Sequence, residues 1–277
     1  MEVTRQKKIA MINDLSGYGR CSLTAALPVI SAMKVQCCPV PTSILSNHTG
    51  YESCFFDDYT DRMPAYIDQW KKLGFTFDGI MTGFLGSKEQ IGIVIDFIRY
   101  FKGENTMVLV DPIMGDHGEA YATYTAEMCG EMKELVQYAD IVTPNLTEAC
   151  LLTDTVYRED GVSRRMLCDL AAKILLMGPK AVVITGIARG KRILNLVEER
   201  GKEPFFTATR RVGCERPGTG DVFASVLGAS VVRGQTVEEG CRKAAVFVKK
   251  CIERSEELKI PIQDGVCFEE CLSFLIR

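Results

Sequence analysis

The residues with the clearest chemical potential are Pro217-Gly218-Thr219-Gly220-Asp221. Two glycines allow a tight loop whose backbone N–H groups point at one anion, and the apolar helix expected over 221–233 adds the positive end of its dipole. Asp221, at the start of that helix, could take a proton from an attacking hydroxyl while the loop holds a phosphoryl group. A glycine-rich turn with Asp221 as the helix cap would explain the same residues. No Gly-Lys-Ser/Thr follows, so the loop is not a P-loop.

Three further polar segments each follow an expected strand. The loop over 111–116 holds two carboxylates, which suits a hydrated Mg²⁺ as well as a simple turn. The segment over 143–148 fits a helix cap, or a site in which Asn145 contacts phosphate and Glu148 contacts metal-bound water. The third segment is Thr185-Gly186. One sheet edge is expected to collect Asp111, Thr143, Thr185 and Asp221.

Two N-terminal segments, 13–20 and 46–49, follow the first two expected strands and offer hydrogen-bonding groups to a small polar ligand. His48 is one of only two histidines, which excludes a multi-histidine metal site. The alternative is a histidine whose hydrogen bonds are satisfied in a loop. Phe84, at another strand end, could stack on an aromatic ring or simply pack in the core.

The elements that must position these residues alternate between short apolar runs and stretches of helical periodicity. Strands are expected over 8–12, 35–40, 79–82, 106–110, 141–143 and 181–185, with a glycine-containing turn over 16–19 and a hairpin over 192–198 and 204–209. Helices are expected over 23–33, 64–73, 88–101, 126–138, 164–177, 221–233 and 236–253. Repeated β-then-α units predict an α/β fold with a mostly parallel sheet between two helical layers. The chain lacks a Pro/Gly/Ser-rich linker, so we expect one domain over 1–277.

Composition narrows the possible partners. Thirty-three Lys and Arg against 36 Asp and Glu give a net charge of -3, which offers no reason to expect nucleic acid or an anionic membrane. Twelve cysteines occur without any CxxC motif. With neither a signal-peptide-like apolar run nor a stretch long enough to span a membrane, we expect reduced thiols and a cytoplasmic location.

Six motifs in order resemble one family. They are SNHTGY at 46–51, TGFLGS at 82–87, DPIMGDHG at 111–118, TPNLTEACLL at 143–152, ITG at 184–186 and GTGD at 218–221. Together they resemble the pyridoxal kinases of the ribokinase-like superfamily over about residues 8–250. GTGD alone marks only the superfamily, whereas SNHTGY with DPxxGD and TPNxxEA is much more specific.

The resemblance implies ATP-dependent phosphorylation of the 5′-hydroxymethyl group of pyridoxal, pyridoxine or pyridoxamine. It implies a single Rossmann-like α/β/α domain, often a homodimer, with Mg²⁺-bound ATP and a monovalent cation such as K⁺. The implied roles, carried over by motif, are Asp221 as catalytic base; Gly218, Thr219 and Gly220 as anion hole; Asp116 and Glu148 as Mg–ATP carboxylates; Asp111 and Thr143 as monovalent-cation site; Thr219, Asn145, Thr185 and Gly186 as ATP contacts; and Thr49 as a pyridine contact. Phe84 stands where the family commonly has tyrosine.

One segment departs from the family. Residues 13–17 are closer to the start of the hydroxymethylpyrimidine kinases of thiamine synthesis, which usually carry GTGC or GSGC and lack SNHTGY. Three hypotheses therefore stay open: a vitamin B6 kinase, a hydroxymethylpyrimidine kinase, and a non-catalytic nucleotide- or vitamer-binding protein. We expect Thr49 and His48 to meet one edge of the ring and Asp14 and Ser16 another, with Asp14 favouring a ligand that presents a donor.

Overall fold

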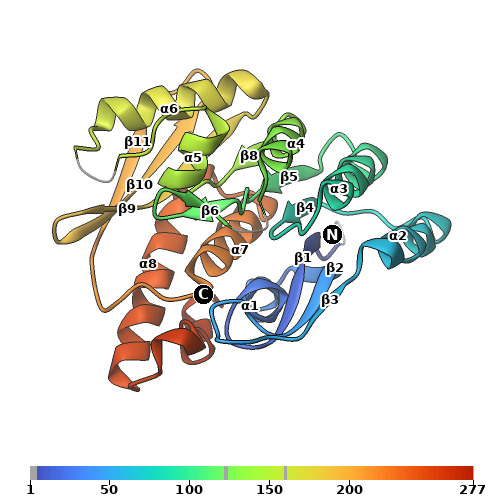
Figure 1. The fold of residues 1–277 in the computed structure, drawn as a ribbon, viewed down its shortest axis with the longest axis horizontal. Helices are drawn as coiled ribbons and strands as arrows, with labels where there is room; N and C mark the ends of the chain where they lie inside the picture. Colours follow the sequence, from blue (N-terminus) through green and yellow to red (C-terminus); the bar gives the residue numbers. More distant parts are fainter. Residues whose placement is uncertain (1–4, 122–123, 159–160, 277) are drawn as a thin grey trace.

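In the computed structural model, which describes residues 5–121, 124–158 and 161–276, a nine-stranded sheet runs between two layers of helices (Figure 1). The strand order is β11-β10-β9-β8-β5-β4-β1-β2-β3, and neighbouring strands from β9 to β2 are parallel. The strands are β1 (Lys8–Tyr18), β2 (Gln36–Asn47), β3 (Phe56–Asp58), β4 (Gly79–Thr82), β5 (Met107–Val110), β8 (Ile141–Val142), β9 (Ala181–Arg189), β10 (Arg192–Glu199) and β11 (Phe205–Arg210). The predicted fold class is confirmed.

The two helical layers bury separate cores. One face carries α2 (Met63–Lys72), α3 (Lys88–Phe101), α4 (Ala126–Val136), α5 (Leu146–Leu152) and α6 (Arg164–Met177), and the other carries α1 (Ser22–Ala32), α7 (Thr219–Val232) and α8 (Val237–Glu257). In β5, Val108 and Val110 face the first core and Leu109 faces the second. The continuous apolar run expected of a parallel strand therefore serves both layers.

Smaller elements complete the chain. A two-stranded hairpin is formed by β6 (Gly115–Asp116) and β7 (Glu119–Ala120). The 3₁₀ helices are η1 (Thr60–Arg62), η2 (Ile262–Asp264) and η3 (Glu269–Phe274). None of the described helices is both long enough and apolar enough to cross a membrane.

The first two strands are longer than predicted, and this matters for the site. Ser16, Gly17 and Tyr18 belong to β1, so the predicted turn over 16–19 is largely wrong. A side chain at Gly17 would lie 3.0 Å from the carbonyl oxygen of Ser46, so glycine here permits close strand pairing rather than a turn. β2 likewise continues to Asn47, which pairs with Tyr18. The two N-terminal polar segments therefore lie side by side.

Candidate active site

Asp221 lies in the first turn of α7, immediately after the glycine loop. Gly218 adopts a left-handed conformation with φ +78°, and any side chain there would collide with the carbonyl oxygen of Arg20. Gly220 differs, because it is helical and no described atom lies within 4 Å of the position a Cβ would take. Only Gly218 is therefore required by the loop conformation, while Gly220 leaves open space beside Asp221.

The surroundings of Asp221 suit a proton acceptor. Burial raises its pKa to about 6, the nearby charge of Asp14 adds to the shift, and hydrogen bonds from the Ser22 backbone and from Asn13 oppose it. The Nδ2 of Asn13 donates to Asp221 Oδ1 at 3.1 Å. A carboxylate that titrates near pH 6 is ionised at neutral pH yet more basic than a free aspartate, as general-base catalysis favours.

Further carboxyl groups lie near Asp221 at the strand ends. Burial, with the charge of Asp221, raises the pKa of Asp111 to about 7, although Thr143 Oγ1 donates to Asp111 Oδ1 at 2.8 Å. Burial and the charge of Asp111 raise the pKa of Glu148 well above its usual value. The predicted gathering of Asp111, Thr143 and Asp221 is thus seen, and it concentrates negative charge that a bound cation would offset.

The β6–β7 hairpin carries Asp116 over this cluster. The hairpin is fastened to α5, since Asn145 Nδ2 donates to Gly115 O at 2.9 Å and the Gly118 N–H donates to Thr147 Oγ1 at 2.9 Å. Asp116 keeps an exposed carboxylate that accepts the His117 N–H at 2.8 Å. Asp116 therefore presents an exposed carboxylate beside this cluster.

Asn145 and Glu148 form the helix cap that was one of the two predicted interpretations. Asn145 Oδ1 accepts the Glu148 N–H, and Glu148 Oε2 accepts the Asn145 N–H, both at 2.8 Å. Glu148 Oε1 also accepts the Met114 N–H at 3.2 Å. Thr185 forms a parallel β-bridge with Asn145, and the Gly186 N–H donates to the buried Asn195. The amide of Asn145 and the N–H of Gly186 thus both have protein partners.

Asp14 and Ser16 lie below the surface of the site. Ser16 Oγ donates to Asp14 Oδ2 at 2.9 Å, and both residues are buried. Burial raises the pKa of Asp14, while hydrogen bonds from the Ser22 and Ser16 hydroxyls oppose this. Asp14 therefore acts on Asp221 through its charge, and a ligand would have to displace a protein partner to bind it directly.

The ring nitrogens of His48 are both occupied within the protein. Nδ1 accepts the Gly50 N–H at 3.1 Å, and Nε2 lies 2.7 Å from the carbonyl oxygen of Gln263, which requires a proton on Nε2. The alternative of a loop-satisfied histidine therefore holds for these nitrogens. Thr49, by contrast, is exposed, and Phe84 is half-buried against the core of the α2–α6 face.

Three residues near the site were given no individual role from the sequence, although Asn13 lies in the 13–20 segment that was predicted to offer hydrogen-bonding groups to a ligand. Asn13 connects two loops, because its Oδ1 accepts the Phe84 N–H at 2.8 Å while its Nδ2 holds Asp221. Partial burial and the charges of Glu148, Asp116, Asp111 and Asp221 raise the pKa of Tyr121, which is 42% exposed. Arg216 is buried beside the glycine loop. In the sequence, the signal for Asn13 was a polar residue directly after an expected strand, and the signal for Arg216 was a cation next to an anion-binding loop.

The donor set suits hard cations. Across residues 5–121, 124–158 and 161–276, no three or more His, Cys, Asp or Glu side chains are arranged to hold a metal by themselves. Mg²⁺ in nucleotide-dependent enzymes usually takes one or two carboxylates, with waters and phosphate oxygens as the other ligands. Asp116 and Glu148 are the pair that the sequence predicted for this role, and the charge of Asp116 acts on Glu148.

Comparisons with known proteins identify relatives of this chain. The family model described as phosphomethylpyrimidine kinase matches residues 19–265. The pyridoxal kinase PdxY of Leifsonia xyli is 27% identical over 252 residues, 87% of each chain. A candidate phosphomethylpyrimidine kinase from Bacteroides thetaiotaomicron is 37% identical, with a TM-score of 0.96 over 100% of this chain and 96% of that one. A second crystal form of it was solved with pyridoxal.

The pyridoxal kinase of Lactobacillus plantarum also shares the fold, with 25% identity and a TM-score of 0.90 over 99% of this chain and 97% of that one. The predicted resemblance to vitamin B6 kinases of ribokinase-like fold is confirmed. On the match over 19–265, the chain belongs to the phosphomethylpyrimidine kinase family.

Proposed function

We propose that the protein uses ATP to phosphorylate the 5′-hydroxymethyl group of a vitamin B6 vitamer, within one domain over 1–277. The observation that carries the phosphoryl-transfer chemistry is Asp221, a carboxylate with a pKa of about 6 at the start of α7, directly after the left-handed Gly218. Support for the ring comes from the Bacteroides thetaiotaomicron relative solved with pyridoxal and from kinases of pyridoxal among the relatives.

In this proposal the chain supplies positioning, charge and one proton acceptor. Asp221 takes the proton of the hydroxymethyl group as its oxygen attacks the γ-phosphorus of ATP. The N–H groups over 218–220 and the N-terminal end of α7 stabilise the negative charge on the transferred phosphoryl group. Asn13 keeps the Asp221 carboxylate oriented toward the hydroxyl, and ADP leaves with the remaining phosphates.

Cations would act beside these residues. We assign Mg²⁺ to Asp116 and Glu148 and a monovalent cation such as K⁺ to Asp111 and Thr143. Mg²⁺ would neutralise phosphate charge during transfer. The high pKa of both Asp111 and Glu148 supports the assignment, because a bound cation keeps a buried carboxyl group ionised.

The remaining contacts to ATP and to the vitamer are assigned from the same predicted motifs. We assign Thr219, Thr185, Gly186 and Asn145 to the ATP side, with Asn145 also serving as the cap of α5. Thr49 and Phe84 are assigned to the ring. His48 is given a changed role: it holds the 47–53 loop through Gly50 and Gln263, and meets the ligand only through its ring carbons. Asp14 and Ser16 are buried beneath the site, where Ser16 holds the Asp14 carboxylate and the charge of Asp14 acts on Asp221.

The alternative substrate is hydroxymethylpyrimidine, which is related to the phosphomethylpyrimidine after which the matching family is named. A panel of pyridoxal, pyridoxine, pyridoxamine and hydroxymethylpyrimidine, each assayed by ADP release, separates the two. We expect kcat/KM for the best B6 vitamer to exceed that for the pyrimidine at least about tenfold, equivalent to about 1.4 kcal/mol. Equal or reversed preference contradicts the B6 proposal and assigns the protein to thiamine synthesis. If none of the four compounds supports release of ADP from ATP, both the B6 and the pyrimidine proposals are contradicted.

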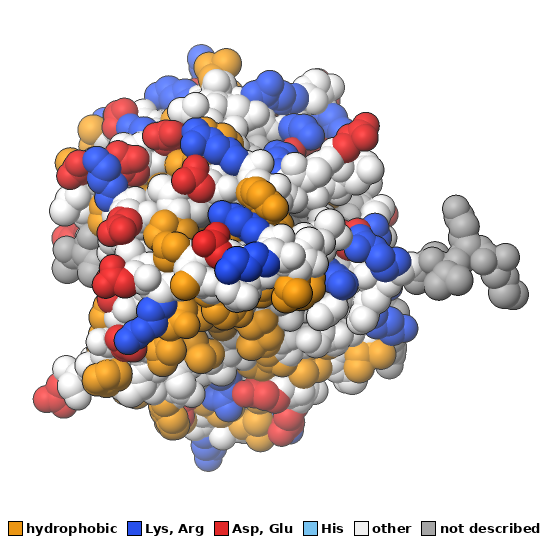
Figure 2. Space-filling view, turned by 90° about the vertical axis from the view of Figure 1, so that its right-hand side faces the viewer, with side chains coloured by type: hydrophobic (Ala, Val, Ile, Leu, Met, Phe, Trp, Pro, Cys, Tyr) orange, Lys and Arg blue, Asp and Glu red, His pale blue; other side chains and the backbone are white. Residues whose placement is uncertain are grey.

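A homodimer and a cytoplasmic location complete the proposal. Figure 2 shows hydrophobic side chains gathered on the side of the molecule that carries the β2–β3 edge of the sheet. Large apolar residues there are well exposed, namely Ile44 at 38%, Phe55 at 68% and Phe56 at 45%. Such a patch on an edge is typical of a protein–protein contact. Light scattering should give twice the chain mass, and Phe55→Asp should reduce the measured mass.

The proposed cytoplasmic location is supported by the cysteines, because all twelve are free thiols, as is usual in a reducing compartment.

A further inference from the structure

The segment over 260–265, which follows α8 and includes η2, is held against the stem of the glycine loop. Arg216 Nη1 donates to the carbonyl oxygens of Ile260 and Pro261, both at 3.0 Å, and of Gly265 at 3.3 Å. Arg216 is buried, and its Nη2 also donates to Glu256 at 2.9 Å. Since the Arg216 carbonyl accepts the Thr219 hydroxyl at 3.2 Å, the segment is fastened directly to the proposed anion hole.

The other side of this segment contacts the loops around the proposed ring site. Tyr51 OH donates to Asp264 Oδ1 at 2.8 Å, and Tyr18 OH donates to Asp264 Oδ2 at 3.3 Å. Arg20 Nη1 donates to the Asp264 carbonyl oxygen at 3.0 Å. His48 Nε2 donates to the neighbouring Gln263 carbonyl. One short segment therefore gathers β1, the 47–53 loop and the glycine loop.

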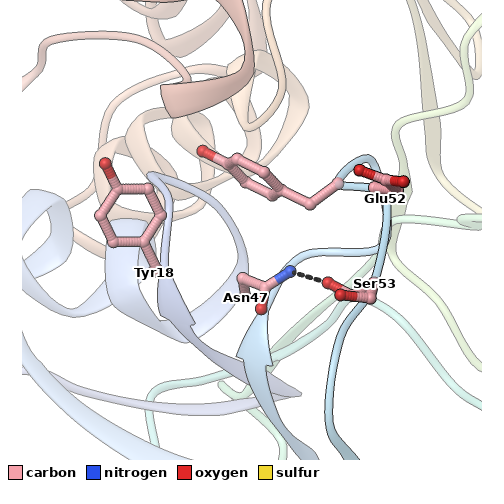
Figure 3. A pocket seen from close by; sticks show the side chains of 5 residues that line it. Tyr18, Asn47, Glu52 and Ser53 are labelled. Carbon is pink, nitrogen blue, oxygen red and sulfur yellow. Dashed lines mark hydrogen bonds between the residues drawn. The ribbon is translucent and has the colours of Figure 1, made fainter.

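The two tyrosines that Asp264 holds are walls of a cavity of about 290 Å³, which Asn47, Glu52 and Ser53 complete (Figure 3). The Tyr18 and Tyr51 rings meet edge to face, with centroids 5.8 Å apart. Asn47 Nδ2 donates to the Ser53 carbonyl oxygen at 2.8 Å and so fixes the floor of the cavity. A space of this size, lined by aromatic rings and amide and carboxylate groups, suits one flat ring with polar substituents.

The cavity also adjoins the residues assigned to the ring. The ring of Tyr51 lies 4.7 Å from that of His48, centroid to centroid, and Thr49 is between them in the chain. Burial and the hydrogen bond to Asp264 raise the pKa of Tyr51 to about 12, so its hydroxyl remains a donor to the carboxylate at neutral pH.

We propose that this cavity is the outer part of the vitamer pocket and that Asp264 is a positioning residue that fixes its two tyrosine rings. The inference rests on the proposed function, because it names where the ring of that substrate is held. Its ligand class is a flat aromatic ring carrying hydroxyl, aldehyde or amine groups, with Glu52 able to accept a hydrogen bond from a hydroxyl or amine.

The test separates ring binding from nucleotide binding. Wild-type protein, Tyr51→Phe and Asp264→Asn are titrated with pyridoxal in the absence of nucleotide, and separately with ADP. Both variants should weaken pyridoxal binding about tenfold, equivalent to about 1.4 kcal/mol, while the Kd for ADP stays within about twofold. Tyr18→Phe, which loses the longer bond, should weaken pyridoxal binding by less than about threefold.

Tyr66→Phe is the matched control, because it also removes a phenol hydrogen bond of 2.8 Å, to the Pro39 carbonyl oxygen, at a position in α2 that takes no part in the site. It should leave both Kd values unchanged. The inference is overturned if Tyr51→Phe binds pyridoxal like the wild type, if pyridoxal and ADP affinities fall together, or if Tyr66→Phe has the same effect. Should Asp264→Asn fail to fold, Tyr51→Phe decides alone.

Failure of the proposed function would look different. If the wild type phosphorylates hydroxymethylpyrimidine and no B6 vitamer, the proposed substrate is wrong. The same three variants titrated with that pyrimidine then decide whether the cavity holds the ring.

Discussion

Replacing Asp221 with asparagine should stabilise the protein while it stops catalysis. Asparagine has nearly the same shape, and its Oδ1 can still accept the Asn13 hydrogen bond that Asp221 now receives at 3.1 Å. What changes is the charge, the ability to take a proton, and the ability to accept the Ser22 N–H, because the Nδ2 of asparagine is only a donor. General-base contributions are typically about 10²- to 10⁴-fold, so we expect kcat to fall by that range while ATP binding stays broadly intact.

The gain in stability follows from the pKa of the carboxyl group. Burial and Asp14 raise it from 3.8 to about 6, so the folded state holds the proton more tightly than the unfolded chain. The wild-type free energy of unfolding therefore falls as pH rises from about 4 to about 6. Removing the charge should recover about 3 kcal/mol at pH 7.5 and about 1 kcal/mol at pH 4.5. Loss of the acceptor for the Ser22 N–H reduces this gain by a similar amount at both pH values.

Urea unfolding of both proteins at pH 7.5 and pH 4.5, with kcat from ADP release, measures both effects. Asp78→Asn is the control of opposite sign: burial raises the pKa of Asp78, but hydrogen bonds from the Lys8 N–H and Lys7, with the charge of Arg5, lower it overall. That variant should lose stability at pH 7.5. A stability difference between the two proteins that does not grow from pH 4.5 to pH 7.5 would refute the electrostatic argument, and a variant that keeps more than half of kcat would remove Asp221 from the role of base.

Four further substitutions test other parts of the site. Asn13→Ala removes a hydrogen bond to the charged carboxylate of Asp221. Steady-state kinetics should show kcat reduced about tenfold or more, and the acidic limb of the kcat/KM profile should move above pH 6 because the pKa of Asp221 rises. An unchanged pH profile would exclude this contact from catalysis. Asp116→Ala should raise the Mg²⁺ concentration for half-maximal rate and leave pyridoxal binding without nucleotide unchanged; the reverse pattern would place Asp116 in the ring pocket. Gly218→Ala, strained by its φ of +78° and by contact with Arg20, should lower the free energy of unfolding by about 1–3 kcal/mol or more, whereas Gly220→Ala should unfold like the wild type and lose activity. Equal unfolding curves for the two glycine variants would contradict the different roles given to these positions.

Elements with a strong local pattern were predictable from the sequence. The helices α3 and α6 have the predicted bounds, 88–101 and 164–177, because Ser87 and Ser163 cap their first turns and apolar residues recur at helical spacing. The strand β4 also has its predicted bounds, since four buried residues form one short run. The cap formed by Asn145 and Glu148 was among the predicted interpretations for the same local reason.

What could not be predicted depends on contacts between distant parts of the chain. Residues 16–18 look like a turn in isolation, but pairing with β2 draws them into a strand. Asn13 and Asp221 are 208 positions apart, so their hydrogen bond has no local signal. The same holds for Arg216 and the carbonyl groups over 260–265, which only the folded chain brings together.

The attachment of residues 260–265 to the site has a consequence for how the protein is made. β1 leaves the ribosome first and can pair with β2 and β4 early in synthesis, together with the helices of the N-terminal half. Tyr51, His48 and Arg216, however, receive their partners only after α8 has been translated. A chain interrupted before residue 260 would keep most of the sheet and the Arg216–Glu256 ion pair, yet lose the three carbonyl partners of Arg216 Nη1. Prematurely terminated chains would therefore be unstable targets for proteolysis, and ring binding would begin only once this segment had been translated.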